Sequence, residues 1–280
     1  AYTKERIQGS DIARRKTGPV PIIDHSDVRR MLLWMKAMVE GMRSLVYTGA
    51  FWLDLSHAMP EEEERARYQA LVDFLTPIIK AYCSEKTYEL LSVSLQTFGG
   101  SGFCKDYPIE QYIRDQKIDT LYEGTTHIQA LDLFFRKVAR DQGKTLQAVL
   151  SDAARFVAQE RGGAAFVEER AKLAHALGVM QSSMQTALGR MQDSVFWVGL
   201  NAIRLFVSLA ELLMAYLLLD QAVTANEKLE LASESDAAFY QGKVASARFF
   251  ASTVLPKLDM RLAQLEGSDL SLMDMDESAF

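Results

Sequence analysis

The chain has 280 residues, 49% of them hydrophobic, which is enough to bury the core of one large domain or of two ordinary ones. Its formal net charge of −6 leaves no basic field that would attract a phosphate backbone, which argues against nucleic acid as a partner. Two cysteines, Cys83 and Cys104, and four scattered histidines lack the spacing of metal ligands, which predicts no metal site and a reduced, cytoplasmic location.

The N-terminal segment predicts a helix over residues 2–8 that starts without a capping residue, so we expect the chain to continue a longer protein or to follow a removed segment. No succession of charged, apolar and small residues predicts a signal peptide there. Residues 17–21, Thr-Gly-Pro-Val-Pro, predict a loop, because proline lacks an amide donor and disfavours helical angles at the preceding residue.

Two long helices are predicted next from apolar side chains that recur every three or four residues. The first carries the stripe between Val28 and Val46 and runs to about residue 55. The second begins at Pro60 and the glutamates of residues 61–64, which suit the positive end of the peptide dipoles. It is kinked or split at Pro77 and ends at the glycines after Phe98. Its inward side chains are expected to be Leu71, Leu75, Ile78, Ile79 and Tyr82.

A short helix from Pro108 and a longer one over residues 126–140 complete a first domain, residues 1–141, as a bundle of four main antiparallel helices. A second helical domain is expected over residues 142–280, with breaks at residues 162–163 and 191–193. Ser233 and Asp236 predict a capping box that starts a last helix ending by Gly267, and the acidic residues 268–280 are expected to be loose. No convincing strand pattern occurs, so the predicted fold class is all-α.

The most apolar helix of the second domain contains residues 202–219. Arg204 and Glu211 lie inside this run, and ionisable groups are costly at the centre of a bilayer, so we expect a helix buried in the protein and no membrane span. One stripe of this helix would face a partner helix, either within the chain, which we favour, or in an oligomer. The stripe consists of Phe196, Leu200, Ile203, Val207, Ala210, Met214 and Leu217.

A series of short motifs carries the functional signal. Residues 96–103 read Gln-Thr-Phe-Gly-Gly-Ser-Gly-Phe, residues 106–108 read Asp-Tyr-Pro, and residues 121–126 read Leu-Tyr-Glu-Gly-Thr-Thr, with Arg114-Asp115 between them. In this order they resemble the C-terminal signature of acyl-CoA dehydrogenases. The resemblance implies the helical C-terminal domain of that family, followed by an extra helical domain similar to that of the 3-methylmercaptopropionyl-CoA dehydrogenase type. Arg114-Asp115 is then expected to be a structural ion pair.

The same resemblance implies that Glu123 is the catalytic base, with Tyr122 and Gly124 beside it at the substrate. Removing a proton next to a thioester carbonyl requires a carboxylate held close to that carbon in a dry site, and Leu121, Tyr122 and Ile128 would supply apolar surroundings. In the family, this glutamate takes the α-proton while the β-hydrogen leaves as hydride to flavin, giving a trans-2-enoyl-CoA. Taken alone, Glu123 could instead be a carboxylate favoured by the dipole in a first helical turn.

FAD is the cofactor that the resemblance implies. Glycines let backbone amides approach an anion, although an isolated pair could equally be a plain helix stop. Residues 2–9 resemble a family segment whose arginine binds FAD phosphate, a task that suits a guanidinium. His127 departs from the glutamine or glutamate usual at its position and could be a surface or capping residue. The residues expected to contact FAD are Arg6, Gln8, Gln96, Thr97, Phe98, Gly99, Gly100, Thr125, Thr126 and His127.

Two functions of different classes follow. The first is part of an FAD-dependent acyl-CoA dehydrogenase, completed by an upstream segment or a partner chain that supplies the missing domains. The resemblance implies an acyl-CoA substrate, electron transfer flavoprotein as electron acceptor, and a homo- or hetero-oligomer; an acyl-CoA oxidase portion is the enzymatic alternative. The second function is a non-catalytic helical assembly subunit of such a complex.

Overall fold

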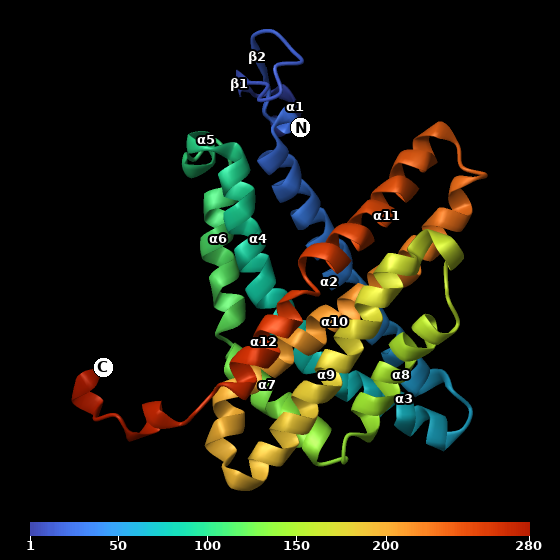
Figure 1. Cartoon of the computed structure of the whole chain (residues 1–280), viewed down its shortest axis with the longest axis vertical. Coiled ribbons are helices and arrows are strands. Elements are labelled where there is room, and N and C mark those ends of the chain that lie inside the picture. Colours follow the sequence, from blue (N-terminus) through green and yellow to red (C-terminus); the bar gives the residue numbers. More distant parts are fainter.

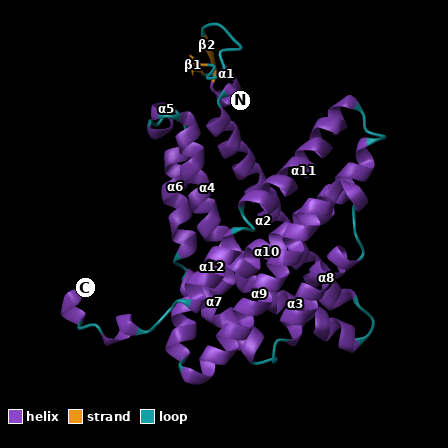
Figure 2. Ribbon diagram, viewed as in Figure 1, coloured by secondary structure: helices purple, strands orange, loops and turns teal.

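Helices account for most of the structure, a computed structural model that describes all of residues 1–280 (Figure 1). Figure 2 shows that strands occur only at one tip, so the predicted all-α class is confirmed. The longest helices are α2 (Ser26–Ala58), α3 (Glu62–Pro77), α4 (Cys83–Phe98), α9 (Val167–Asp193), α10 (Val195–Leu229) and α11 (Glu234–Thr253). The shorter α-helices are α1 (Tyr2–Glu5), α5 (Gly100–Phe103), α6 (Ile109–Lys117), α7 (Thr126–Leu131), α8 (Lys144–Ala158) and α12 (Lys257–Glu266). Two π-helical segments, η2 (Ile78–Tyr82) and η4 (Asp132–Ala139), and several 3₁₀ turns complete the chain.

The two long helices predicted from apolar spacing are present. Pro77 ends α3, the π-helical turn η2 follows, and α4 continues to Phe98, so the expected split at this proline is confirmed. The inward residues of this stretch are buried as expected, except that Ile79 is only partly covered. On α2 the expected stripe is less complete, because Val39 and Val46 are exposed.

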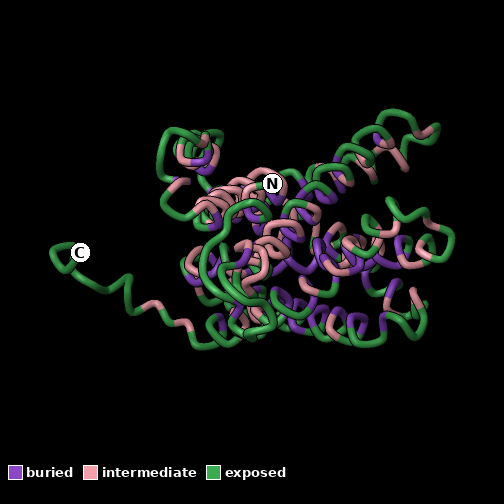
Figure 3. The backbone as a smooth tube through the Cα atoms, turned by 90° about the horizontal axis from the view of Figure 1, so that it is seen from above, coloured by how far each residue is buried: buried purple, intermediate pink, exposed green.

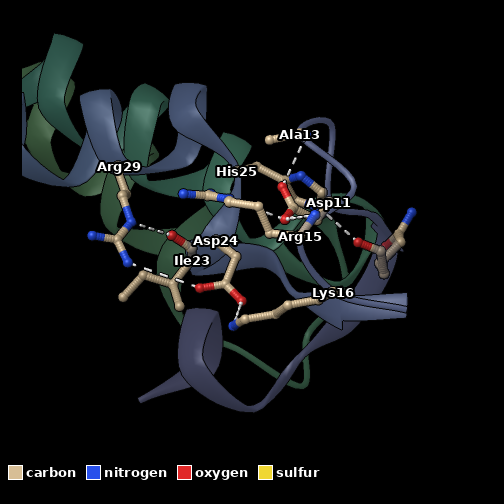
Figure 4. A network of polar contacts seen from close by, with 9 residues as sticks. Asp11, Ala13, Arg15, Lys16, Ile23, Asp24, His25 and Arg29 are labelled. Atoms are coloured by element: carbon tan, nitrogen blue, oxygen red, sulfur yellow. Dashed lines mark hydrogen bonds and ion pairs between the residues drawn. The ribbon is translucent and has the colours of Figure 1, made fainter. Parts of the chain in front are cut away.

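The N-terminal segment differs from its prediction. Helix α1 ends at Glu5, and the chain then forms strand β1 (Ile7–Ser10), which pairs antiparallel with β2 (Pro19–Pro21) inside the expected loop. A buried side chain accounts for the difference: Asp11 accepts hydrogen bonds from the backbone amides of Ala13 and Arg15, each at 3.0 Å, and so closes the connecting loop (Figure 4). Aspartate at such a turn offers the backbone an alternative to a helix.

Helix α10 forms the centre of the molecule and contacts helices of both halves, among them α2, α7, α9, α11 and α12. The expected stripe describes it poorly. Ala210 and Met214 are buried, but Phe196 and Ile203 are 62% and 41% exposed, and residues on other sides of the helix are buried instead. A helix covered on nearly all sides has no single buried stripe. Although α10 is long and apolar enough to cross a membrane, 72% of its most apolar window is buried within the protein, as expected.

The predicted last helix is divided. The capping box is confirmed, since the Asp236 amide donates to Ser233 Oγ at 3.3 Å and the Ser233 hydroxyl donates to the Asp236 carboxylate at 2.9 Å. Helix α11 nevertheless stops at Thr253, and α12 starts after Pro256, because proline cannot continue the hydrogen-bond ladder. Beyond Gly267, Ser268 and Leu270 are still half-buried against the body, and only the exposed residues 271–280 extend away from it (Figure 3).

One hydrophobic core runs through both halves of the chain, from α2 and α3 to α11 and α12. Gly41 of α2 permits a close approach to α10, since an added Cβ there would overlap the methyl group of Met214. Glu211 of α10 is 1% exposed, and its carboxylate accepts from Arg261 Nη1 of α12 at 2.7 Å and from the Tyr82 hydroxyl of η2 at 3.4 Å. The division into domains at residues 141 and 142 stays a prediction, and the two parts share this core.

Candidate functional site

A cavity of about 380 Å³ lies where the N-terminal segment meets the end of α4. Six of the residues expected to contact a cofactor line it together, although the two groups are about ninety positions apart in the sequence. They are Arg6, Gln8, Gln96, Thr97, Phe98 and Gly99. The structure therefore assembles a single polar and aromatic cavity from two motifs, one at each wall.

Aromatic packing holds the two walls together. The ring of Tyr2 stacks on that of Phe98 with centroids 4.7 Å apart, and Tyr107 closes the cluster at 4.9 Å from Phe98. The Tyr2 hydroxyl also donates to the Phe98 carbonyl oxygen at 3.1 Å. Such contacts between distant segments fix the position of α1 against the end of α4 and thus the width of the cavity.

Arg6 gives this cavity a positive charge that no carboxylate of the chain neutralises. Its guanidinium is exposed, forms no ion pair, and donates only to Gln8 Oε1 at 3.4 Å. Opposite, Nε2 of His25 donates to the Gln8 carbonyl oxygen at 2.8 Å and so holds β1 in place. Figure 4 shows the contacts around His25: Asp24 pairs with Lys16 at 2.7 Å, and Arg29 donates to the Ile23 carbonyl oxygen at 2.8 Å. Because the Arg6 guanidinium forms no ion pair within the chain, it is free to bind an anionic group.

The glycine turn supplies open backbone at the other wall. Gly99 has φ +58° and ψ −147°, a conformation that residues with a Cβ rarely adopt, and it joins α4 to the short helix α5. No atom lies within 4 Å of where a Cβ would stand at Gly99 or Gly100. Thr97, by contrast, is buried, and its hydroxyl donates to the Ser94 carbonyl oxygen at 2.7 Å within the helix. An anionic ligand would accordingly meet the turn through its backbone.

Glu123 lies in a turn between η3 (Ile118–Thr120) and α7, and its own φ is +54°. It precedes Thr125, the N-cap of α7, by two residues, so it is not a carboxylate of a first helical turn. A left-handed conformation at a residue with a side chain costs about 1–3 kcal/mol and persists only where its surroundings enforce it. We call this turn, residues 121–125, the base loop, after the role that the motif resemblance implies for Glu123.

The base loop presents one face to solvent in this chain. Glu123 is exposed, as are about half of the surfaces of Leu121, Tyr122 and Ile128, so the apolar surroundings expected for a base are present but uncovered. The Asp119 carboxylate, with partial desolvation and the charge of Glu123, holds the pKa of Tyr122 above its usual value. On the inner side, Lys80 Nζ donates to the Gly124 carbonyl oxygen at 2.6 Å.

The remaining expected residues lie outside the cavity. Gly100 and Thr125 do not line it, and the Thr126 hydroxyl is buried against Glu85, donating to its carboxylate at 2.5 Å. His127 Nε2 instead donates to the Gly199 carbonyl oxygen of α10 at 2.9 Å, beside an apolar groove. A cofactor role for these residues stays a prediction.

Arg114 and Asp115 do not pair with each other, which corrects the expected ion pair. The Arg114 guanidinium binds Glu110, one helical turn earlier on α6, at 3.1 Å, and Asp115 accepts from Gln111 at 3.5 Å. Consecutive residues of a helix point in different directions, whereas residues four apart are neighbours. The spacing of Glu110, four residues before Arg114, therefore indicated the observed ion pair.

Sequence reasoning missed two side chains at these sites, His25 and Lys80. His25 follows the insertion that separates β1 from β2, and Lys80 reaches the base loop from 44 positions away. Neither forms a local motif with the residues it contacts, so no spacing pattern could have identified them.

Comparison with known families covers both halves of the chain. Residues 9–136 match the family described as Acyl-CoA dehydrogenase, C-terminal domain. Residues 143–276 match the family described as Acetyl-CoA dehydrogenase C-terminal like. The first match contains the glycine turn and the base loop, and the second contains α8 to α12.

Individual relatives agree with these matches. The chain is 43% identical to the broad-specificity linear acyl-CoA dehydrogenase FadE5 of Mycobacterium tuberculosis. The match covers all of this chain and 48% of that protein. It is 35% identical to the 3-methylmercaptopropionyl-CoA dehydrogenase of Ruegeria pomeroyi over 98% of this chain and 46% of the relative. An acyl-CoA dehydrogenase of Bacillus anthracis complexed with FAD superposes with TM-score 0.67 at 17% identity, over 96% of this chain and 46% of the other, which shows a common fold. The chain thus spans about half the length of the curated relatives it matches.

Proposed function

We propose, from the premise that this chain belongs to the acyl-CoA dehydrogenase family and spans its C-terminal helical region, that it provides the catalytic base and one wall of the FAD site of an acyl-CoA dehydrogenase. The observation that carries the proposal is Glu123, a solvent-facing glutamate in a strained turn that contacts from behind hold in place. Its sequence context, Tyr-Glu-Gly-Thr, belongs to the matched region. Because the chain spans about half the length of the relatives it matches, the activity is proposed for an assembly that also contains the remaining domains.

Glu123 would remove the α-proton of an acyl-CoA, and the bonding pair of that carbon–hydrogen bond would form the new double bond as the β-hydrogen leaves with its electrons. The product is a trans-2-enoyl-CoA. When bound, FAD supplies the acceptor for this hydride. The chain's own contribution is to hold the carboxylate near the α-carbon, in surroundings that Leu121, Tyr122 and Ile128 make apolar once they are covered.

The cavity at Arg6 and Gly99 fits the phosphate region of FAD. Arg6 is a cation without an internal partner, and Gly99 and Gly100 leave space for close approach of a ligand to the backbone. Gln8 and Gln96 add polar side chains at the same walls. These features support an anionic nucleotide at this place, held by Arg6, Gln8 and the backbone of residues 96–99.

Replacing the base tests the proposal directly. In the full-length protein reconstituted with FAD, Glu123→Gln should slow anaerobic bleaching of the flavin by acyl-CoA by about a thousandfold, because the amide cannot accept the proton. Glu89→Gln is the matched control, since Glu89 is an exposed glutamate of α4 that pairs with Lys86. It should bleach at the wild-type rate. Undiminished bleaching in Glu123→Gln would refute the assignment.

Several finer features stay predictions of the family relation. Electron transfer flavoprotein is the expected electron acceptor, and oxygen consumption at the rate of substrate turnover would favour an oxidase instead. A homo- or hetero-oligomer and a cytoplasmic location are likewise expected. A non-catalytic assembly role would be supported if the purified complex contained a second chain with its own base and flavin while Glu123→Gln kept full activity.

A further inference from the structure

We propose that Lys80 is a positioning residue for Glu123, because it fixes the base loop through the carbonyl group that follows the base. The inference rests on the proposed function of Glu123 and goes beyond it, since neither the motifs nor the resemblance gives Lys80 a role. Lys80 Nζ donates to the Gly124 carbonyl oxygen at 2.6 Å. The contact joins η2 directly to the residue after Glu123.

A second contact joins the same ammonium group to Tyr122, the residue before the base in sequence. Lys80 Nζ lies 5.6 Å from the centroid of the Tyr122 ring, the distance of a cation–π contact. Lys80 therefore touches the residues immediately before and after Glu123.

Two further hydrogen bonds complete the support of the base loop. Gln129 Nε2 donates to the Glu123 carbonyl oxygen at 2.9 Å, and the Thr126 hydroxyl donates to the Glu85 carboxylate at 2.5 Å. Lys80 and Glu85 both come from the stretch that starts with η2, so this stretch binds the loop through a donor and binds Thr126, the first residue of α7 after the loop, through an acceptor. The left-handed conformation of Glu123, φ +54°, needs such over-determined surroundings to persist.

The position of Lys80 depends on the π-helical turn. Pro77 ends α3, and the wider turn η2 that follows shifts every later side chain around the helix axis relative to an uninterrupted α-helix. Tyr82 and Ile78 of η2 are buried in the core, while Lys80 is only partly buried and reaches outward to the loop. Single π-helical turns occur often at functional sites, which agrees with a role for this one.

Loss of the two Lys80 contacts should reduce the reaction rate without removing the base. A displacement of about 1 Å in a reacting group can lower a rate by about a hundredfold. In the full-length, FAD-loaded protein we therefore expect Lys80→Met to slow flavin bleaching by about ten- to a hundredfold. The KM for acyl-CoA should change by less than about threefold, since Lys80 would act through Glu123 and not on the substrate. Lys80→Arg, which keeps a charged donor, should recover most of the rate.

Hydrogen exchange supplies a readout that does not depend on activity. The amides of Tyr122 and Gln129 are bonded to the carbonyl oxygens of Ile118 and Thr125 at 3.1 Å each, so their exchange reports opening of the loop. Lys80→Met should speed exchange at these two amides by about tenfold and leave the α10 core unchanged. The matched control is Lys86→Met, because Lys86 lies on the same stretch but binds Glu89 at 2.7 Å. It should change neither readout.

The outcomes separate the two proposals. Normal bleaching in Glu123→Gln refutes the proposed function, and the exchange data still decide whether Lys80 holds the loop. Abolished bleaching in Glu123→Gln with normal bleaching and exchange in Lys80→Met refutes the positioning role alone. A folded Lys80→Arg protein no faster than Lys80→Met also refutes it. If Lys80→Met yields no folded protein, Lys80→Gln, whose shorter side chain cannot reach the same carbonyl oxygen, is measured in its place with the same expectations.

Discussion

The junction around Glu211 treats charge differently from two exposed sites at opposite ends of α4, which we together call the rim: the cavity of Arg6 with the glycine turn, and the base loop with Glu123. At the junction, Glu211 is buried and bound to Arg261 and Tyr82, so its charge is compensated inside the protein. At the rim, Arg6 and Glu123 are exposed and have no oppositely charged partner within the chain. In Figure 3, buried residues gather in the body of the molecule, while exposed residues form its projecting ends and the C-terminal tail. Stability and chemistry are thus assigned to different regions, and substitutions should separate them.

The largest effect is expected at the junction. Arg261→Met would leave the Glu211 carboxylate buried without its cation, which should destabilise the protein by about 3–5 kcal/mol in denaturant unfolding. The double variant Arg261→Met with Glu211→Leu removes both charges and should recover much of the loss. A loss below about 1 kcal/mol in the single variant would mean that the junction does not stabilise the fold. Glu123→Gln, at the rim, should leave the free energy of unfolding unchanged.

A smaller effect is expected at the glycine turn, which belongs to the rim but has a structural requirement. Gly99→Ala should cost about 1–2 kcal/mol, since alanine is strained at φ +58° although no neighbour would obstruct its methyl group. Gly100→Ala is the control, because Gly100 lies in α5 without a positive φ and has equally open space. Thermal unfolding of both variants measures the difference. Equal stability would show that the turn adopts another conformation.

Arg6→Met should change ligand binding alone. Losing one charge-assisted contact to a phosphate should weaken FAD binding by about tenfold, or about 1.4 kcal/mol, with no change in the unfolding transition. Flavin fluorescence titration of the apoprotein measures the affinity. Lys4→Met serves as the control, because Lys4 is an exposed cation of α1 that does not line the cavity. Equal affinities of the two variants would remove Arg6 from the phosphate site.

The smallest effect concerns pH and the contact between α2 and α11. Burial opposes ionisation of Glu40, but the Lys36 ammonium, the Ser246 hydroxyl and the charge of Lys243 together outweigh it and hold the pKa of Glu40 below its usual value. The folded state therefore gains stability above the usual pKa of glutamate, and this gain is lost as pH falls through the lowered value. We expect about 0.5 kcal/mol, because Lys36 remains partly exposed. Glu40→Gln should flatten that part of the stability profile, measured by denaturant unfolding between pH 3 and 7, a range set by ordinary carboxyl pKa values.

Local signals predicted much of the fold. The splits at Pro77 and at residues 162–163, and the capping box at Ser233, depend on residues close in sequence and are found where expected. The division at Pro256 carried the same kind of signal and was overlooked. The hairpin at the N-terminus was not predictable from periodicity, because the side chain of Asp11 closes its loop and the strands are only three or four residues long.

The candidate site was predictable only in part. Motif resemblance selected Arg6, Gln8 and residues 96–99, which the fold brings to one cavity. It could not reveal the strained φ of Glu123 or the contact from Lys80, since both depend on how η2 packs against the base loop. The stripe on α10 failed for a different reason: a helix covered on nearly every side gives no clean periodicity.

The core shared by α2, α10 and α11 ties the two halves of the chain together. A chain cut after residue 141 would leave Met38 and Met42 of α2 without the helices that cover them, and the Tyr82 hydroxyl without Glu211. The C-terminal helices are therefore part of the same hydrophobic core as the first half of the chain. Without these helices, the apolar surface of α2 would face solvent, and a chain shortened in this way would tend to aggregate or to bind another apolar surface in their place.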